Sequence, residues 1–273
     1  MSGNTSIVGK SPVAVAVNAA AKAGEWIKTK LGGFDNLMLK SSEQDLVTEV
    51  DKGAELLIKN LLRTYFPDHA FLGEESVPPG AEESRQALER LKNEEYLWII
   101  DPIDGTTNFV HGFPFFCVSI GLAHRGEVVA GIIYDPIHDE MFVGEKGKGA
   151  YLRGRKLQVS QEQRLAGSLL ATGFPPRIES WHPQKVAGIV PKVRSVRTTG
   201  SAALHLAYVA AGRLSGFWEP NLNVWDMAAG ILLVQEAGGR VSDFEGNPYS
   251  LTVRDVVATN GHIHDELLEY IRG

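Results

Sequence analysis

The strongest chemical signal in the chain is the run at residues 101–108, which reads DPIDGTTN. Two carboxylates, Asp101 and Asp104, stand three residues apart directly after a short apolar segment. Pro102 restricts the backbone between them, and Gly105 permits a tight turn that a ligand can approach closely. The hydroxyl residues that follow stand where a helix or turn would begin, and free N–H groups at such a start bind phosphate.

This run predicts two metal-binding carboxylates beside a phosphate-binding turn. Ligands that are all oxygen atoms favour a hard cation such as Mg²⁺. Taken alone, the run is also compatible with a turn that simply exposes its carboxylates to water.

Four further carboxylates occur at the ends of expected elements. Glu74 and Glu75 follow an apolar pair at an expected strand end, Asp51 lies one turn inside an expected helix, and Asp226 opens an Ala-rich helix. A charged loop is the alternative for the first two. Capping with solvation is the alternative for Asp51, and interaction with the helix dipole alone is the alternative for Asp226.

The charge balance favours a metal site over these alternatives. The formal net charge is −6, which is the wrong sign for direct nucleic-acid binding and unusual for a protein that binds phosphate esters. Two carboxylates about 5 Å apart repel by roughly 3 kcal/mol at an effective dielectric of about 20. Bound divalent cations would remove this repulsion and would attract an anionic substrate.

The surrounding pattern predicts layered sheets covered by helices, with an α+β first half (1–150) and an α/β second half (151–273) in one compact unit. Helices are expected at 12–31, 48–66, 184–190, 202–211, 226–237 and 265–271, with a short helix inside a surface loop at 78–95. Strands are expected at 96–100, 115–124, 127–134, 140–146, 150–152, 168–172, 193–196, 214–218, 240–242 and 256–258.

The remaining reactive residues are given structural roles. Cys117, the single cysteine, is expected to be a buried small hydrophobe, and His111 a structural residue. The other histidines, His182, His262 and His264 among them, are expected at the surface. The sequence shows no signal peptide and no run of apolar residues long enough to span a membrane, so a cytoplasmic protein is predicted.

Four segments taken together resemble the inositol monophosphatase family: 45–51, 73–76, 101–108 and 225–230. They occur in the family's order, and the resemblance extends by motif from Lys40 to Gly239. The complete DPIDGTTN run with Trp98 before it is similar to the inositol branch, and 173–177 is similar to bacterial and archaeal members. The resemblance implies an α-β-α-β-α sandwich that forms a homodimer, with two or three Mg²⁺ ions per subunit.

The resemblance also implies a ligand set. Glu74, Asp101 and the Ile103 carbonyl would hold the first Mg²⁺. Asp101, Asp104 and Asp226 would hold the second, and a third ion would lie near Glu74 on waters.

Further roles follow from the same resemblance. Glu74 and Thr106 would orient the attacking water, with Asp51 supporting Thr106. Substrate contacts would come from Asp104, Gly105, Thr106, Gly200, Ser201, Ala202, Glu219 and Asp226, with Lys40 and Glu75 as further candidates. A solvated surface position is the alternative for Glu219 and for Lys40.

The implied function is Mg²⁺-dependent, lithium-sensitive hydrolysis of small phosphate monoesters by in-line attack of a metal-activated water, without a covalent phosphoenzyme. Myo-inositol monophosphate is the leading substrate. Fructose 1,6-bisphosphate, histidinol phosphate and a nucleotide bisphosphate are alternatives within the fold. A regulatory protein-binding role is an alternative of another class.

Overall fold

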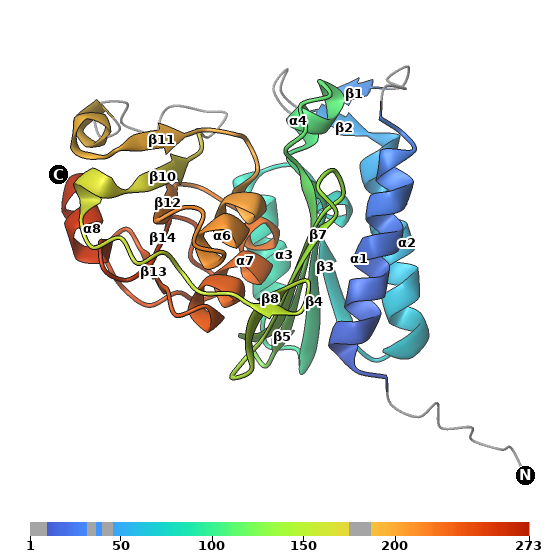
Figure 1. Cartoon of the computed structure of the whole chain (residues 1–273). Helices are drawn as coiled ribbons and strands as arrows, with labels where there is room; N and C mark the ends of the chain where they lie inside the picture. Colours follow the sequence, from blue (N-terminus) through green and yellow to red (C-terminus); the bar gives the residue numbers. More distant parts are fainter. Residues whose placement is uncertain (1–9, 32–36, 40–45, 175–186, 273) are drawn as a thin grey trace, which may run out of the picture.

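The computed structural model describes residues 10–31, 37–39, 46–174 and 187–272, with backbone alone at 37–39 and 46–48. Its elements form five layers, seen edge-on in Figure 1: a helix pair, a large sheet, a central helix layer, a small sheet and an outer helix. The predicted α-β-α-β-α sandwich is therefore confirmed.

The first layer consists of α1 (Pro12–Lys28) and α2 (Glu49–Tyr65). Pro12 suits the first turn of a helix, where its missing N–H would have no partner. The buried residues of α1 recur at helical spacing and are mostly alanine and valine, which lets the helix lie close to the sheet. Both predicted helices were right in position, although α1 ends at Lys28 rather than at residue 31.

The large sheet has the strand order β3-β4-β5-β6-β7-β8-β9. Only β3 and β4 are parallel, and every other neighbouring pair is antiparallel. The strands are β3 (Ala70–Gly73), β4 (Tyr96–Asp104), β5 (Cys117–His124), β6 (Glu127–Asp135), β7 (Glu140–Glu145), β8 (Gly149–Leu152) and β9 (Arg155–Lys156). The strand predicted at 96–100 is longer than expected because β4 continues through the first residues of the DPIDGTTN run.

The central layer contains α6 (Ala202–Ala210) and α7 (Val224–Glu236), which are buried on nearly every side because a sheet covers each face of the layer. The helix α3 (Ala81–Leu91) packs on the same face of the large sheet as α7. A row of glycines lets α7 approach the large sheet closely. Gly121, Gly131 and Gly144 are register partners across three neighbouring strands. A Cβ on Gly131 would lie 2.5 Å from the Ala229 carbonyl oxygen, so the helix backbone touches the sheet directly.

The small sheet has the strand order β11-β10-β12-β14-β13 and is covered on its outer face by α8 (His264–Arg272). Its strands are β10 (Leu169–Thr172), β11 (Ser195–Arg197), β12 (Gly216–Glu219), β13 (Arg240–Asp243) and β14 (Val256–Thr259). The two sheets use separate stretches of chain, but α7 packs on both, and the division into halves near residue 150 stays a prediction.

Shorter elements lie around the first half. The strands β1 (Leu37–Leu39) and β2 (Leu46–Thr48) pair with each other, and β2 lies beside α4 (Thr106–Val110) (Figure 1). Three 3₁₀ turns complete the described part: η1 (Glu74–Ser76), η2 (Leu165–Gly167) and η4 (Val190–Lys192). Residues 184–186 of the helix predicted at 184–190 lie outside the described residues, and residues 187–189 are helical as predicted.

The surface assignment of the histidines was wrong for two of them. His264 is fully buried, with one ring nitrogen 2.9 Å from Ser242 Oγ and the other 2.9 Å from Thr259 Oγ1. His205 is buried between the rings of Phe115 and Phe217. A buried imidazole is tolerated where hydroxyl groups satisfy its nitrogens, and the polar sequence around His264 gave no sign of such partners.

Two other assignments are confirmed: Cys117 is buried, and His262 is exposed at the surface. His182 lies outside the described residues. Across the described residues, no helix is both long and apolar enough to cross a membrane.

The glycine row generates a stability prediction. Gly131→Val should lower the free energy of unfolding by about 1–3 kcal/mol or more, because the new side chain has to push the backbone of α7 off the sheet. Urea denaturation followed by circular dichroism measures this loss. Gly188→Ala is the matched control, since a Cβ added at Gly188 would have no neighbouring atom within 4 Å. Wild-type stability in Gly131→Val would contradict the close helix–sheet contact.

Candidate active site

An irregularity in strand pairing brings the two aspartates of the run to one face of the sheet. Asp101 is opposite Ser119, whereas Asp104 is opposite Cys117, so three residues of β4 span what two residues of β5 span. In a regular strand, residues three apart point to opposite faces. The bulge absorbs one residue, and Asp101 and Asp104 therefore share a face.

Asp101 lies at the centre of a group of carboxylates. Its side chain is 2% exposed, and its Oδ1 accepts a hydrogen bond of 3.0 Å from Ile103 N. Burial raises its pKa well above the ordinary value, and the nearby charges of Glu74, Asp104 and Asp226, with Asp51, raise the pKa further. These five carboxylates come from the turn η1 after β3, from β4, from α2 and from α7, which places them around one point.

Asp226 reaches this point from the first turn of α7. Its Oδ2 accepts a hydrogen bond of 2.7 Å from Asn223 N, which closes the N-terminus of the helix. Burial raises the pKa of Asp226 well above normal, with further contributions from the charges of Glu74 and Asp104. Asp226 therefore caps its own helix, which the sequence did not predict, and it also lies among the other carboxylates.

Asp104 is held by the N-terminus of α6. Its Oδ2 accepts hydrogen bonds from Ser201 Oγ at 2.5 Å and from Ala203 N at 2.7 Å, and the Cys117 thiol lies 3.9 Å away. Burial raises the pKa of Asp104 to about 6, although these hydrogen bonds act to lower it. Ser201 and Ala202, which were predicted to contact substrate, are therefore brought beside Asp104.

The turn after Asp104 is closed by contacts from distant parts of the chain. Gly105 has a φ of 97°, and a Cβ there would meet the carbonyl oxygens of Phe115 at 3.0 Å and Gly200 at 3.2 Å. Asn108 Nδ2 donates to Phe115 O at 2.6 Å and to Thr199 O at 2.7 Å. These contacts join α4 to the loop that leads into α6.

Thr106 makes a local hydrogen bond within this turn. Its Oγ1 donates to Ile103 O at 3.0 Å. A carbonyl oxygen has two lone pairs, so the Ile103 carbonyl can still accept a second partner.

Glu219 lies at the carboxyl end of β12, at the edge of the carboxylate group. Burial raises its pKa to about 8, and the charge of Asp104 contributes. Its carboxylate packs on the backbone of Gly173, where a Cβ would lie 2.0 Å from Glu219 Oε2. A simple surface position, the alternative from the sequence, does not fit these surroundings.

The remaining predicted residues differ in their placement. The backbone N–H of Glu75 donates to Glu55 Oε2 at 2.8 Å, and Lys40 lies outside the described residues. Sequence reasoning missed Glu55, Lys59 and Asn108. The first two stand on the apolar face of α2, where charged side chains are unusual, and that was the available signal. Asn108 was inside the run but was not assigned a role.

The donor set fits a hard divalent cation. The site gathers carboxylate oxygens whose burial and mutual repulsion disfavour the ionised form, and a cation would relieve both effects. Among the described residues, no three His, Cys, Asp or Glu side chains already form a closed ligand set. Mg²⁺ does not need one, because it keeps several waters and is held by one or two carboxylates.

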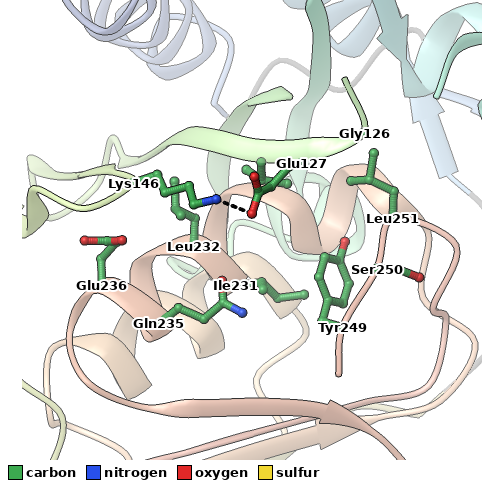
Figure 2. Close-up of a pocket in the computed structure, with 11 residues that line it drawn as sticks. Gly126, Glu127, Lys146, Ile231, Leu232, Gln235, Glu236, Tyr249, Ser250 and Leu251 are labelled. Carbon is green, nitrogen blue, oxygen red and sulfur yellow. Dashed lines mark ion pairs between the residues drawn. The ribbon is translucent and has the colours of Figure 1, made fainter. Parts of the chain in front are cut away.

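A pocket lies away from the carboxylates (Figure 2). This pocket of about 160 Å³ is bordered by Tyr249 and Leu251 on one side and by Gln235 on the other, with an ion pair between Lys146 and Glu127 at its rim. It contacts the C-terminal half of α7, about 13 Å along the helix from Asp226. No residue of the carboxylate group lines it, so it is not the candidate active site.

Comparison with known proteins shows which proteins the chain is similar to. Residues 10–273 match the model of the inositol monophosphatase family. Inositol monophosphatase 2 of Solanum lycopersicum is 44% identical over 94% of this chain and 96% of its own length. The Nus factor SuhB of Pseudomonas aeruginosa is 43% identical over 94% of both chains. The crystal structure of the extragenic suppressor protein suhB from Bartonella henselae superposes with a TM-score of 0.86, at 41% identity over 95% of this chain and 97% of that one.

The raised carboxyl pKa values generate a pH prediction. Because the pKa of Asp104 is about 6 when folded, the folded metal-free protein binds this proton more tightly than the unfolded chain does. In EDTA, about 3 kcal/mol of unfolding free energy should therefore be lost as pH rises from about 4 through 6. Glu219, with a pKa of about 8, extends this loss to higher pH.

Thermal unfolding with EDTA and with Mg²⁺, at pH 5 and pH 8, measures the effect. Mg²⁺ should raise the melting temperature more at pH 8, because the carboxylates are then ionised. Asp101→Asn keeps the acceptor for Ile103 N and should lose most of the response to Mg²⁺. An equal Mg²⁺ response at both pH values would contradict this account.

Proposed function

The chain belongs to the inositol monophosphatase family, and on this premise we propose that it is a Mg²⁺-dependent phosphatase of small polyol phosphates, with myo-inositol monophosphate the leading substrate. The family is metal-dependent, and relatives that carry its enzyme name support phosphatase activity. The observation that carries the proposal is the convergence of Glu74, Asp101, Asp104 and Asp226 from separate elements.

We propose that two or three Mg²⁺ ions bind each subunit. Glu74, Asp101 and the Ile103 carbonyl would hold one ion, and Asp101, Asp104 and Asp226 another. When bound, such ions neutralise the charge of the phosphoryl oxygens and of the leaving oxygen, and they lower the pKa of water. A chain of net charge −6 needs this positive charge to bind a phosphate ester.

The protein groups then have distinct tasks. The backbone N–H groups of Gly105 and Thr106 bind phosphate oxygens, and the Glu74 carboxylate with Thr106 Oγ1 orients the attacking water, with Asp51 supporting Thr106. The bond between the water oxygen and phosphorus forms as the ester P–O bond breaks on the opposite side of phosphorus. The Glu74 carboxylate takes a proton from the attacking water, and the leaving alkoxide takes a proton from solvent water and departs as the alcohol. The protonated Glu74 then returns its proton to the solvent, so that no net proton is gained or lost by the protein.

We assign substrate specificity to residues at the edge of the carboxylate group. We propose that Glu219 accepts hydrogen bonds from hydroxyl groups of the substrate, and that Gly200, Ser201 and Ala202 line the opposite wall. Support comes from the position of Glu219 at the end of β12, close enough to Asp104 that the charge of Asp104 raises the pKa of Glu219. Lys40 and Glu75 stay candidates for peripheral contacts. Homodimer formation and a cytoplasmic location are also part of the proposal.

A protein-binding role competes with catalysis as the main function. The relative from Pseudomonas aeruginosa is called a Nus factor rather than an enzyme. Fructose 1,6-bisphosphate, histidinol phosphate and a nucleotide bisphosphate compete as substrates within the same chemistry. The next experiment separates these possibilities.

Phosphate release from inositol 1-phosphate and from these three competing esters, with Mg²⁺ and with EDTA, tests the proposal. The wild type should be most active on inositol 1-phosphate and inactive in EDTA. Asp104→Asn should lower kcat by more than about 100-fold, since even partners of metal ligands contribute 10- to 100-fold. Asp265→Asn, at an exposed ion pair with Arg240, is the matched control and should keep full activity. Turnover of none of the esters by the wild type would favour the protein-binding role.

Glu219→Gln tests the assignment of the polyol contact. It should lower kcat/KM for inositol 1-phosphate by about 10- to 100-fold, the contribution of a hydrogen bond to a charged group. An aryl phosphate without hydroxyl groups should lose much less, because it has nothing to offer Glu219. Equal losses on both substrates would rule out a specific role in polyol binding.

A further inference from the structure

The turn that carries Glu74 is held in place by a buried ion pair on α2. We propose that Glu55, together with Lys59 and Ser76, positions Glu74 for metal binding. The inference rests on the proposed role of Glu74 as a metal ligand. It assigns Glu55, Lys59 and Ser76 as positioning residues, which act through Glu74 rather than on the substrate.

The Glu55 carboxylate uses both of its oxygens on the turn and its surroundings. Oε2 accepts a hydrogen bond of 2.8 Å from Glu75 N, and Oε1 accepts from Ser76 Oγ at 2.6 Å and from Lys59 Nζ at 2.7 Å. Lys59 Nζ is also 2.5 Å from Ser76 Oγ, so the three side chains form a closed triangle. Glu55 thus contacts the two residues that directly follow Glu74.

Glu55 also packs against the residue that precedes Glu74. A Cβ on Gly73 would lie 2.3 Å from Glu55 Oε2, so any side chain at Gly73 would displace the carboxylate. Gly73 has ordinary extended backbone angles, with φ −121° and ψ 146°, which any residue could adopt. The glycine is therefore required by the space that Glu55 occupies rather than by its own backbone conformation.

The turn needs such external support because it is too short to hold itself. η1 has three residues, and its N-cap residue, Gly73, has no side chain to cap it. Glu55, which belongs to α2, supplies the missing acceptor, because its carboxylate accepts a hydrogen bond from the backbone N–H of Glu75. Glu74 lies between Gly73 and Glu75, and Glu55 contacts both of these neighbours, so Glu55 fixes the backbone from which the Glu74 side chain extends.

The positive charge of Lys59 stabilises the buried carboxylate of Glu55. Glu55 and Lys59 are only 4% and 8% exposed, and an unpaired carboxylate so deeply buried would be strongly unfavourable. The site nearby already contains several carboxylates. Because Lys59 neutralises Glu55, the support of Glu74 adds no net negative charge to the site.

The spacing along α2 links this support to the rest of the site. Asp51, Glu55 and Lys59 follow at four-residue intervals and are all buried on one face of the helix. Each step is about 6 Å along the axis. One rigid helix therefore carries both Asp51, which lies near Asp101, and the pair that holds the turn of Glu74.

Isothermal titration of the purified protein with Mg²⁺, without substrate, tests the inference. Glu55→Gln should weaken Mg²⁺ binding by about 10- to 100-fold, the usual effect of losing a partner of a metal ligand. The Mg²⁺ concentration for half-maximal activity should rise to the same extent, while kcat at saturating Mg²⁺ should recover toward wild type. Ser76→Ala, at an exposed position, should weaken binding in the same direction, and Ser76→Thr should bind as the wild type does.

Glu89→Gln is the matched control because Glu89 forms an exposed pair with Lys92 at the same 2.7 Å distance, and Mg²⁺ binding should not change. Wild-type Mg²⁺ affinity in folded Glu55→Gln would overturn the inference, even if that variant melted at a lower temperature. If Glu55→Gln does not fold, equal Mg²⁺ affinity of Ser76→Ala and Ser76→Thr overturns it. Failure of the proposed function is distinguishable, because it would appear as a wild type that binds Mg²⁺ but hydrolyses no ester.

Discussion

Mutual repulsion among buried carboxylates is the constraint on which the rest of this structure depends. Asp101, Asp104 and Asp226 are placed where water solvates them poorly, and where Asp104 raises the pKa of the other two and Asp226 raises the pKa of Asp101. Without a cation, an arrangement of this kind opposes folding, and a bound cation converts the same arrangement into binding energy. The scaffold therefore has to hold the carboxylates in place against their repulsion until the cation binds.

The scaffold does so by attaching each carboxylate to a rigid element. A bulge between β4 and β5 sets the direction of Asp101 and Asp104, and backbone N–H groups at the start of α6 hold Asp104. The glycine row beneath α7 fixes the height of that helix above the sheet, and with it the position of Asp226. A buried Glu–Lys pair on α2 holds the turn of Glu74. Because backbone atoms and whole helices make most of these contacts, side-chain motion changes the positions of the carboxylates little.

Local spacing in the sequence was enough to predict most of the helices and strands that carry the carboxylates. The 3.6-residue pattern of α2, the Ala-rich α7 and the apolar run before Asp101 predicted elements that the structure contains within a few residues. The long-range partners could not be predicted in this way. Nothing near Asn108 indicates that its amide reaches Thr199, and nothing around His264 indicates that Ser242 and Thr259 bury it.

The sequence by itself determined which donor groups the protein has and where each stands on its own element, because these depend on residue type and on periods of two or 3.6 residues. Only the tertiary structure decided that the end of β3, the end of β4 and the first turns of α2 and α7 meet at one point. It also decided that Glu55 lies under the turn of Glu74, although the two are far apart along the chain. These meetings depend on how whole elements pack, and packing is set by the shapes of many side chains at once rather than by any local pattern.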